Sequence, residues 1–527
     1  MVMSKQAVED FLARPLRDSD KAKRFSDDAL DSKLRAAGLS FLGKPLRTAQ
    51  KVCLLLAWKY PRYLILMGMG GGKTRVILDL FRNRKLKGQA RRMLVVVPYV
   101  VNLREWCLEA EKHVPDVVIE ALTMSGKGSR LEALRGSAEV IVVTMQGLGS
   151  LCADVVEDEK KGKNKWALDH KQLQESVGSH FDMLVLDEST LVMNHQSFSF
   201  RLIKSLAKGT KYFYELTGTP FDKDVEALWS QFLLVDGGYA LGETLGLFRE
   251  AYFRKVKTYW AFEWEFRKLK KDELHRRLRH CSIRYSESEC QDLPEAVGGL
   301  SGDDLMLLPS VLPKEQQPYY AALEKELHTL EHGQLKAIDS AYTRMRMVTS
   351  GWLGTTDEDG ERVTIRFKHN PKLDSVIEKL REIPEDEKVL IVHWFNVSGQ
   401  LVVDRLNKEK KLGKHAWVYG KTSMAQKTAF MDAFRDPKGP RILVASTAIK
   451  MGVNLQDACR YTIFFESPDS VIDRKQLEGR TRRESDIKSG SRYFYDAVCL
   501  GTKDEPRIRS LREGRRLLDM IVDGKKG

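Results

Sequence analysis

Short apolar segments alternate with helix-like segments in two separate stretches of this 527-residue chain. The apolar segments are hydrophobic almost throughout, as expected of strands that helices cover on both faces. Strands that alternate with helices in this way form parallel sheets. We therefore predict an α/β fold with two parallel-sheet lobes in tandem. The expected strands are residues 62–67, 93–97, 140–144, 182–187 and 212–217 in the first lobe, and residues 388–393, 415–419, 441–446, 461–466 and 493–498 in the second.

The sequence between the two stretches is charged and has a helical pattern, which predicts helical insertions and the connection between the lobes. The polar first residues predict a short helical extension, and the charged segment 154–166 predicts a solvated loop. The expected domains are the N-terminal extension 1–42, lobe 1 at 43–235, the helical insertions and inter-lobe connection at 236–370, and lobe 2 at 371–527.

The composition favours a polyanionic partner and argues against a membrane protein. The formal net charge is +14 and the pI is near 9.2, so nucleic acid is the first candidate, although many soluble proteins are equally basic. The seven cysteines are scattered without a C-x-x-C pair, which fits a reducing, cytosolic type of compartment. The sequence shows neither the apolar stretch of a signal peptide nor the roughly 20 apolar residues that span a bilayer.

A glycine-rich segment, MGMGGGKT at residues 67–74, joins the first expected strand to a helix. Its glycines allow backbone N–H groups to surround phosphate oxygens, Lys73 can reach the β- and γ-phosphates, and the Thr74 hydroxyl can bind Mg²⁺. Met67 stands where the usual pattern has its first glycine, so a flexible turn is an alternative on this motif alone. The candidate phosphate-binding residues are Gly70, Gly71, Gly72, Lys73 and Thr74.

A second motif, LVLDES, supplies the acidic residues that a phosphate site needs. Asp187 comes at the carboxyl end of an apolar segment, where it can hold Mg²⁺ through water, and Glu188 can orient and deprotonate the attacking water. Asp-Glu-Ser alone is also common in turns. The two motifs together, each after an expected strand, indicate hydrolysis of ATP.

These motifs resemble those of the Swi/Snf-like ATPases, DNA-translocating members of helicase superfamily two. The family's first motif reads close to DEMGLGKT, which residues 67–74 match through M-G-x-G-K-T, so Met67 need not be glycine. The resemblance extends from about Gly43 to the last residues. In chain order the further matches are VVVPYVVNLREW (motif Ia), VIVVTMQGL (Ib), LVLDEST (II), ELTGTP (III), KVLIVHWF (IV), ILVASTAIKMGVNL (V) and QLEGRTRRES (VI).

The resemblance implies two RecA-like lobes with nucleotide between them and assigns further residues. Arg480 and Arg483 would be the arginine fingers, and Gln476 would contact nucleotide or water. Gln50 would contact the adenine base, and Gly452 belongs to the nucleotide-binding part of motif V. The residues implied to touch nucleic acid, or to couple it to ATP, are Pro98, Thr144, Thr217, Thr219 and Ser446.

Two positions depart from the family pattern. Thr190 stands where many relatives have a histidine that bridges to motif III or VI, which predicts altered coupling with hydrolysis retained. Gly71 stands where the family has a larger residue, which predicts a more mobile loop and weaker nucleotide binding.

Together, the motifs and the resemblance predict a motor that uses ATP and Mg²⁺ to move along duplex DNA, with largely nonspecific contacts to the DNA backbone. We expect a monomer in the cytoplasm, or in the host cytoplasm if the chain is viral or phage, directed to any specific sequence by a protein partner. One alternative is a strand-separating helicase on DNA or RNA. The other is an ATP-dependent, nucleic-acid-binding switch that remodels a protein partner without translocating.

Overall fold

The computed structural model divides the chain into two compact units, each with one parallel sheet. Unit 1 comprises Met1–Val256, Trp264–Gln291 and Leu518–Gly527, and unit 2 comprises Lys257–Glu263 and Asp292–Leu517. The predicted fold class is therefore confirmed. The structure describes residues 4–123, 126–158, 163–169, 173, 177, 180–257, 262–290, 293–329, 335–356, 361–450, 455–482 and 490–523.

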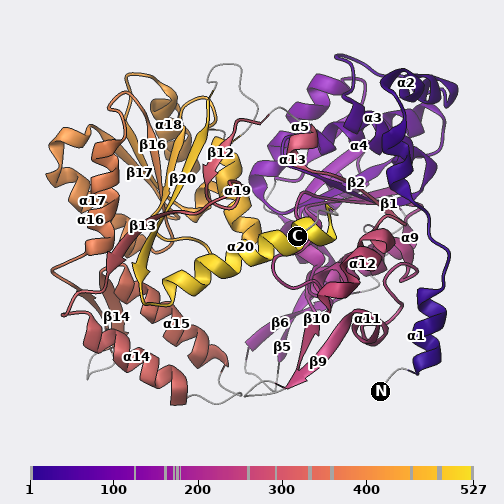
Figure 1. Ribbon diagram of the computed structural model, residues 1–527. Helices are drawn as coiled ribbons and strands as arrows, with labels where there is room; N and C mark the ends of the chain where they lie inside the picture. The colour runs from indigo at the N-terminus through magenta and orange to yellow at the C-terminus, as the bar shows by residue number, and fades with distance from the viewer. Residues whose placement is uncertain are drawn as a thin grey trace. The chain divides into compact units, whose positions relative to one another are not determined.

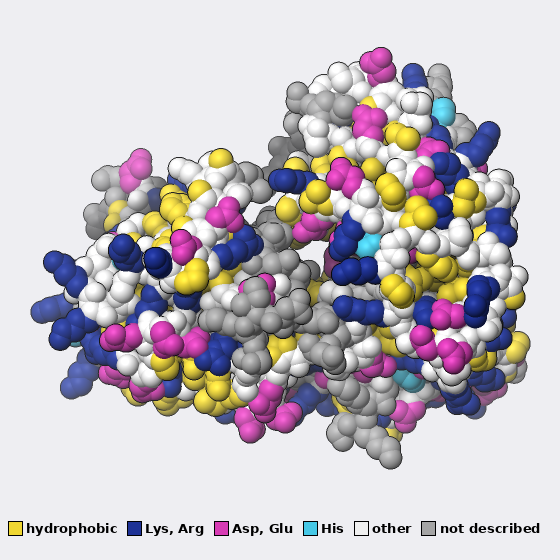
Figure 2. All heavy atoms as spheres, turned by 90° about the horizontal axis from the view of Figure 1, so that it is seen from above, with side chains coloured by type: hydrophobic (Ala, Val, Ile, Leu, Met, Phe, Trp, Pro, Cys, Tyr) yellow, Lys and Arg dark blue, Asp and Glu magenta, His cyan; other side chains and the backbone are white. Residues whose placement is uncertain are grey.

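The surface carries charges of both signs. On the face shown in Figure 2, Lys and Arg side chains are interspersed with Asp and Glu side chains. Within the described ranges, no helix combines the length and the apolar character that crossing a bilayer requires.

The sheet of unit 1 has seven strands in the order β11-β1-β8-β7-β2-β4-β3, and every neighbouring pair is parallel. Strands β1 and β2 are labelled in Figure 1. The five predicted strands are all present, and their residues are buried almost without exception. The strands are β1 (Arg62–Met67), β2 (Met93–Val97), β3 (Ile119–Ala121), β4 (Val140–Thr144), β7 (Met183–Asp187), β8 (Tyr212–Thr217) and β11 (Ser282–Tyr285).

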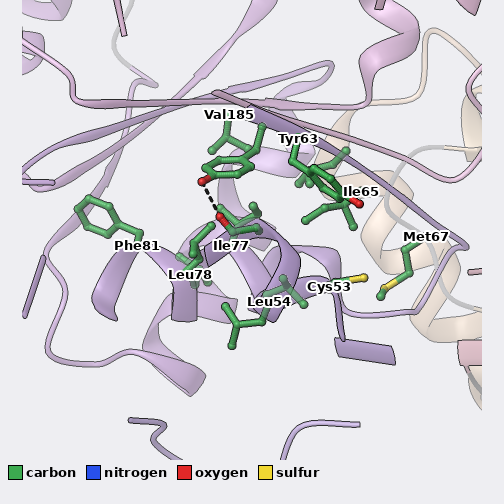
Figure 3. Packing of buried hydrophobic residues seen from close by; sticks show 14 of the residues in the cluster. Cys53, Leu54, Tyr63, Ile65, Met67, Ile77, Leu78, Phe81 and Val185 are labelled. Carbon is green, nitrogen blue, oxygen red and sulfur yellow. Dashed lines mark hydrogen bonds between the residues drawn. The ribbon is translucent and has the colours of Figure 1, made fainter. Parts of the chain in front are cut away.

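The main core of unit 1 lies between this sheet and several helices, among them α3, α4 and α5. Tyr63, Ile65 and Met67 alternate along β1 and pack against α3 and α4 (Figure 3). The helices of this part of the chain are α3 (Thr48–Lys59), α4 (Lys73–Leu86), α5 (Val100–His113), α6 (Lys127–Arg135), α7 (Met145–Cys152), the short η3 (Ser189–Val192), α9 (Phe198–Gly209), α10 (Ala227–Asp236) and α11 (Leu245–Tyr252).

The N-terminal residues form short helices that pack into the same core. These helices are α1 (Lys5–Leu12), η1 (Ser19–Arg24) and α2 (Asp27–Ala36). Leu30 and Leu34 of α2 are buried in the core, and the Tyr63 hydroxyl of β1 donates a hydrogen bond to Ser19 Oγ. The extension is therefore an integral part of unit 1.

Unit 1 also includes residues from the far end of the chain, which follow unit 2 in sequence. After α20 (Asp504–Ile521), Asp523 pairs with Arg284 of β11, and the two side chains are 5% and 3% exposed. Arg279 donates to the carbonyl oxygen of Val522, and His275 Nδ1 lies 2.9 Å from the carbonyl oxygen of Ile521. His275 belongs to α12 (Lys271–Leu278), which follows η4 (Lys268–Lys270), and α13 (Glu287–Cys290) follows β11.

Two antiparallel hairpins extend the α/β pattern of the first part of the chain. The segment predicted to be a solvated loop instead forms β5 (Ala153–Asp158) and β6 (Lys163–Leu168), so that prediction was wrong. Pairing of the two strands supplies the backbone hydrogen bonds that a loop would have to take from water. The other hairpin consists of β9 (Phe253–Lys257) and β10 (Phe262–Phe266).

The sheet of unit 2 is also parallel, in the order β12-β20-β19-β16-β18-β17, with β13 paired to β20 beyond β12 (Figure 1). Two apolar clusters fill its two faces. The strands are β12 (Ala296–Gly298), β13 (Met306–Val311), β16 (Val389–His393), β17 (His415–Val418), β18 (Ile442–Ser446), β19 (Tyr461–Phe464) and β20 (Arg492–Leu500), with the hairpin β14 (Trp352–Thr356) and β15 (Arg362–Arg366). The helices are α14 (Gln317–Thr329), α15 (Leu335–Thr349), α16 (Pro371–Glu382), α17 (Asn396–Lys408), η6 (Lys410–Leu412), α18 (Met424–Arg435), η7 (Thr447–Lys450) and α19 (Val471–Thr481).

The region predicted to hold helical insertions also contributes strands to both sheets. β11 joins the sheet of unit 1, and β12 and β13 join that of unit 2. These strands are short, and β13 has exposed residues at every second position and contains Pro309, which an edge strand tolerates. Such segments lack the continuous apolar pattern that identifies central strands.

Glu215 introduces a carboxyl group into the middle of the unit 1 sheet. It is fully buried between Leu64 of β1 and Leu186 of β7, and burial raises its pKa well above the ordinary value, opposed by the charge of Arg62. Among the described residues, neither carboxyl oxygen has a hydrogen-bond partner. The folded state therefore favours the protonated acid.

This pKa shift predicts a pH-dependent stability change for Glu215→Gln. Above about pH 4.5 the unfolded chain releases the Glu215 proton before the folded chain does, so wild-type stability falls as pH rises toward the folded pKa. Glutamine cannot titrate, so the free energy of unfolding of the variant, relative to that of the wild type, should rise by up to about 1.4 kcal/mol per pH unit in this window. Urea unfolding of both proteins from pH 4.5 to 8 measures the difference, and a constant difference would contradict the prediction.

Candidate active site

The predicted site residues of unit 1 gather where parallel strands end. β1, β7 and β8 are neighbours, with Leu66 opposite Thr217 and Asp187 opposite Leu216. Strands β2 and β4 end at the same edge, so Pro98 directly follows β2 and Thr144 ends β4. Thr144 also caps α7 by accepting a hydrogen bond from the Gly147 N–H. A contact of these residues with nucleic acid remains a prediction.

The glycine-rich loop turns sharply between β1 and α4. Gly70 and Gly72 have φ of +74° and +83°, a left-handed conformation that glycine adopts without strain. A Cβ atom at Gly72 would lie 2.1 Å from Gln50 Nε2, so only glycine fits there. Gln50 donates from Nε2 to the Gly71 carbonyl oxygen (3.2 Å) and accepts the Arg47 N–H at Oε1 (2.9 Å). The structure thus places Gln50 against the loop.

Gly71 has a different reason to be glycine. A Cβ atom there would lie 2.4 Å from Cγ and 2.5 Å from Sδ of the buried Met67, and 3.0 Å from Sγ of Cys290. Real Cβ atoms do not approach other atoms this closely. Met67 therefore occupies the volume that a larger residue at position 71 would need, and the two residues form a complementary pair.

Lys73 begins α4 and holds the loop closed. Its Nζ donates to the carbonyl oxygens of Met67 (2.8 Å) and Gly68 (3.2 Å), and Thr74 follows in the first turn. Burial raises the pKa of both Asp187 and Glu188, and the charge of Lys73 opposes that rise. Lys73 therefore lies within electrostatic range of both carboxylates.

Asp187 ends β7 and is held by a tryptophan. The indole Nε1–H of Trp106, on α5, donates to Asp187 Oδ2 at 2.8 Å, and Trp106 is only 1% exposed. Burial raises the pKa of Asp187, while the Trp106 hydrogen bond and Lys73 oppose the rise. Trp106 was not predicted as a site residue, although a buried indole N–H usually needs a polar partner.

Glu188 has a strained backbone and a firmly held side chain. Its φ of +73° is the one positive value for a non-glycine residue in the described ranges, and such strain typically costs about 1–3 kcal/mol. The Thr217 hydroxyl accepts the Thr219 N–H (3.1 Å) and so directs its own proton to Glu188 Oε1 (2.5 Å). Thr190 donates to the same oxygen at 3.2 Å.

The environment of Glu188 balances burial against these contacts. Burial raises the pKa of its carboxyl group, and the Thr217 hydrogen bond, Lys73 and the Thr190 hydrogen bond lower it. The loop after β8 is also held in place, because buried Arg284 donates from Nη1 to the carbonyl oxygen of Gly218 at 2.7 Å. These contacts hold the Glu188 carboxyl group, a hydrogen-bond acceptor, in a defined position.

These donors fit a magnesium-bound nucleotide. No group of three or more His, Cys, Asp or Glu residues that could enclose a metal lies within the described part of the chain. Asp187 at the end of β7 and Thr74 in the first turn of α4 are the candidate oxygen ligands, and Mg²⁺ commonly takes its remaining ligands from phosphates and water.

Unit 2 carries the remaining predicted residues on α19 and β18. Gln476 and Arg480 are half-buried on α19, and Ser446 ends β18 and is buried. Buried Arg474 anchors the helix through ion pairs with Glu478 (2.7 Å) and Asp496, a contact that was not predicted. Gly452 and Arg483 lie outside the described residues.

Two family models match the chain, one after the other along the sequence. The model of the SNF2-related domain matches residues 58–347, and that of the helicase conserved C-terminal domain matches residues 371–485. The first match spans more than half of the chain and contains the glycine-rich loop, Asp187, Glu188 and Thr217.

Two curated proteins and two solved structures show similarity over most of the chain. "Putative protein p41" of Acyrthosiphon pisum secondary endosymbiont phage 1 is 24% identical over 87% of this chain and 94% of its own length. The "Putative ATP-dependent helicase/translocase YwqA" of Bacillus subtilis is 23% identical over 87% of this chain, which spans only 46% of that protein.

The structures are of the SWI2/SNF2 ATPase core of Sulfolobus solfataricus. The core in complex with dsDNA is 20% identical, with a TM-score of 0.39 over 91% of this chain and 94% of that chain. The core domain alone is 20% identical, with a TM-score of 0.38 over 92% of each chain.

The pairing of Gly71 with Met67 predicts the result of enlarging Gly71. The family pattern alone predicts that a larger residue at position 71 strengthens binding, but the space around Gly71 predicts the opposite. Gly71→Leu should weaken ATP binding by at least about tenfold, since overpacking typically costs about 1–3 kcal/mol and here displaces the loop itself. Met67→Ala combined with Gly71→Leu should recover much of the affinity, and Met67→Ala alone should bind nearly as the wild type does. Titration with a fluorescent ATP analogue measures all three, and a double variant as weak as Gly71→Leu would contradict the pairing.

Proposed function

This chain belongs to the SNF2-related family of ATP-hydrolysing enzymes, and on that premise we propose that it is a motor that moves along duplex DNA. The observation that carries the proposal is the convergence of Lys73, Asp187 and Glu188 at one edge of a parallel sheet. Further support comes from the name of the Bacillus relative, which describes a helicase or translocase.

The glycine-rich loop and Lys73 would bind the phosphates of ATP. Backbone N–H groups at the N-terminus of α4 would face the phosphate oxygens, where the helix dipole favours negative charge. Lys73 would exchange its carbonyl acceptors, Met67 and Gly68, for the β- and γ-phosphates. Binding of ATP thus replaces contacts that keep the loop closed, and Gln50 would contact the base from beside the loop.

The two carboxylates have different roles in hydrolysis. Asp187, oriented by Trp106, would hold Mg²⁺ through water together with Thr74. The ion, when bound, neutralises charge on the β- and γ-phosphates. Glu188 would accept a proton from the attacking water, and its buried setting makes it a stronger base than an exposed carboxylate.

Unit 2 would supply the cations that complete catalysis. We assign this role to Arg480 and Arg483, with Gln476 contacting nucleotide or water. An arginine finger is typically worth roughly 10³ to 10⁵ in rate. Gly452 of motif V would also lie at the nucleotide.

Duplex DNA is the proposed track, held mainly through its phosphates. The net charge of +14 supports a polyanionic partner. The residues at the strand ends would contact the DNA backbone or couple DNA binding to ATP hydrolysis. Phosphate contacts carry no sequence information, so binding should be nonspecific and weakened by salt. Any targeting to a specific DNA sequence would come from a protein partner. We propose a monomer as the working unit. The proposed contact residues are Pro98, Thr144, Thr217, Thr219 and Ser446.

Substitutions separate binding from hydrolysis. Lys73→Ala should weaken ATP binding and abolish turnover, because the phosphate-binding cation is lost. Glu188→Gln should retain ATP binding but lower kcat by at least about 10², the lower range for removing a general base. Phosphate release and ATP-analogue titration measure both effects. Lys87→Ala, at an exposed lysine beyond the other end of α4, is the matched control and should behave as wild type. Turnover that survives in both site variants would refute the assignment.

The track is tested by comparing nucleic acids. Duplex DNA should stimulate ATP hydrolysis more than single-stranded DNA or RNA, and ATP should drive displacement of a triplex-forming strand from duplex DNA. Stronger stimulation by single-stranded nucleic acid would favour the strand-separating helicase. Stimulation without displacement would favour the switch that remodels a partner, and Glu188→Gln should fail to displace in every case.

A further inference from the structure

Gln231, on α10, connects the two loops that surround Glu188. Its side chain is fully buried, and its Oε1 accepts a hydrogen bond from Ser189 Oγ at 2.5 Å. Its Nε2 donates to the carbonyl oxygens of Pro220 (2.5 Å) and Ala227 (3.0 Å). Because both carbonyls can only accept, the orientation of the amide is fixed and all three contacts form together.

The connection runs beside the Thr217–Glu188 hydrogen bond. Ser189 is fully buried and directly follows Glu188, whereas Pro220 lies three residues after Thr217. Hydrogen bonds thus connect the turn after β7 to the loop after β8 in two places, once through the Glu188 carboxylate and once through the Gln231 amide. A shift of one loop against the other would break both ties.

We propose that Ser189 and Gln231 are positioning residues for ATP hydrolysis, which hold Glu188 on the Thr217 hydroxyl. The inference rests on the proposed role of Glu188 as the base. It also accounts for the absence of a histidine at position 190. Thr190 bonds Glu188 itself, and the bridge from motif II to motif III passes through α10 instead.

The physical need for this bridge lies in the backbone of Glu188. A left-handed, non-glycine conformation persists only where the surrounding structure imposes it. The Glu188 N–H bond to the Leu216 carbonyl (2.9 Å) imposes it from one side, and the buried Ser189 hydroxyl, bound to Gln231, imposes it from the other. Misplacement of a catalytic group by about 1 Å can cost about 10² in rate.

The test uses three variants of the full chain and one matched control. Gln231→Met keeps a similar volume and removes both ties, Ser189→Ala removes only the serine tie, and the third variant combines them. The control is Ser230→Ala, which removes a buried hydroxyl from the same helix. This hydroxyl donates to the Met193 carbonyl and shares the Ala227 carbonyl with Gln231, but it bonds neither Ser189 nor Pro220. The ATPase is assayed without nucleic acid, with kcat, KM, ATP affinity and melting temperature measured for each.

The bridge predicts a loss in kcat with little change in KM. Gln231→Met should lower kcat by about 10- to 100-fold with KM changed less than about threefold, since misplacement of Glu188 affects the transition state more than ATP binding. Ser189→Ala should lower kcat less. The double variant should be no slower than Gln231→Met, because both changes break one path. Ser230→Ala should keep wild-type kcat.

Three results would overturn the inference. They are wild-type kcat in Ser189→Ala, additive losses in the double variant, or an equal loss of kcat in Ser230→Ala. Ser189→Ala removes a single hydroxyl, so it decides the matter even if Gln231→Met does not fold. If Glu188→Gln is inactive while these variants are active, only the positioning role fails. If Glu188→Gln is active, the proposed base itself fails.

Discussion

The shared direction of the strands in unit 1 is the constraint on which the site depends. Because β1, β7 and β8 are parallel neighbours, the glycine-rich loop, Asp187 and Thr217 all follow strand ends at one edge. Antiparallel pairing of any of these strands would place its chemistry at the opposite edge. The loops there can be short and still bring Lys73 within electrostatic range of both Asp187 and Glu188, which the proposed hydrolysis of ATP requires.

Much of the fold could be predicted, because central parallel strands are apolar on both faces. All ten expected strands are present within a residue or two of their predicted bounds. The missed strands have weaker signals: β11 follows a basic helix, and β13 alternates with exposed residues and contains a proline. The β5–β6 hairpin was missed because the middle of its segment, residues 157–165, consists of charged and polar residues and a glycine, so the short apolar stretches on either side do not stand out in the hydrophobic pattern.

The sequence motifs located the glycine-rich loop and the Asp187–Glu188 pair, which the structure places at neighbouring strand ends, because these candidate residues are adjacent in sequence. Prediction failed where a partner comes from another element. Trp106 and Gln231 each contact the site from a helix, and their sequence positions resemble ordinary core positions. The fit of Gly71 against Met67 is likewise a matter of side-chain volume in three dimensions. What is gained from the structure is thus the set of residues that orient the chemistry.

The contacts of Ile521, Val522 and Asp523 have a consequence for how the protein folds during synthesis. Their partners, Arg279 and Arg284 among them, are made more than 200 residues earlier, and the main segment of unit 2, Asp292–Leu517, is translated in between. Until the later residues emerge, the buried guanidinium of Arg284 lacks its counter-ion, and a charge buried without its partner is costly. These contacts of unit 1 cannot form until the main segment of unit 2 has been synthesised, so this last step of folding has high contact order.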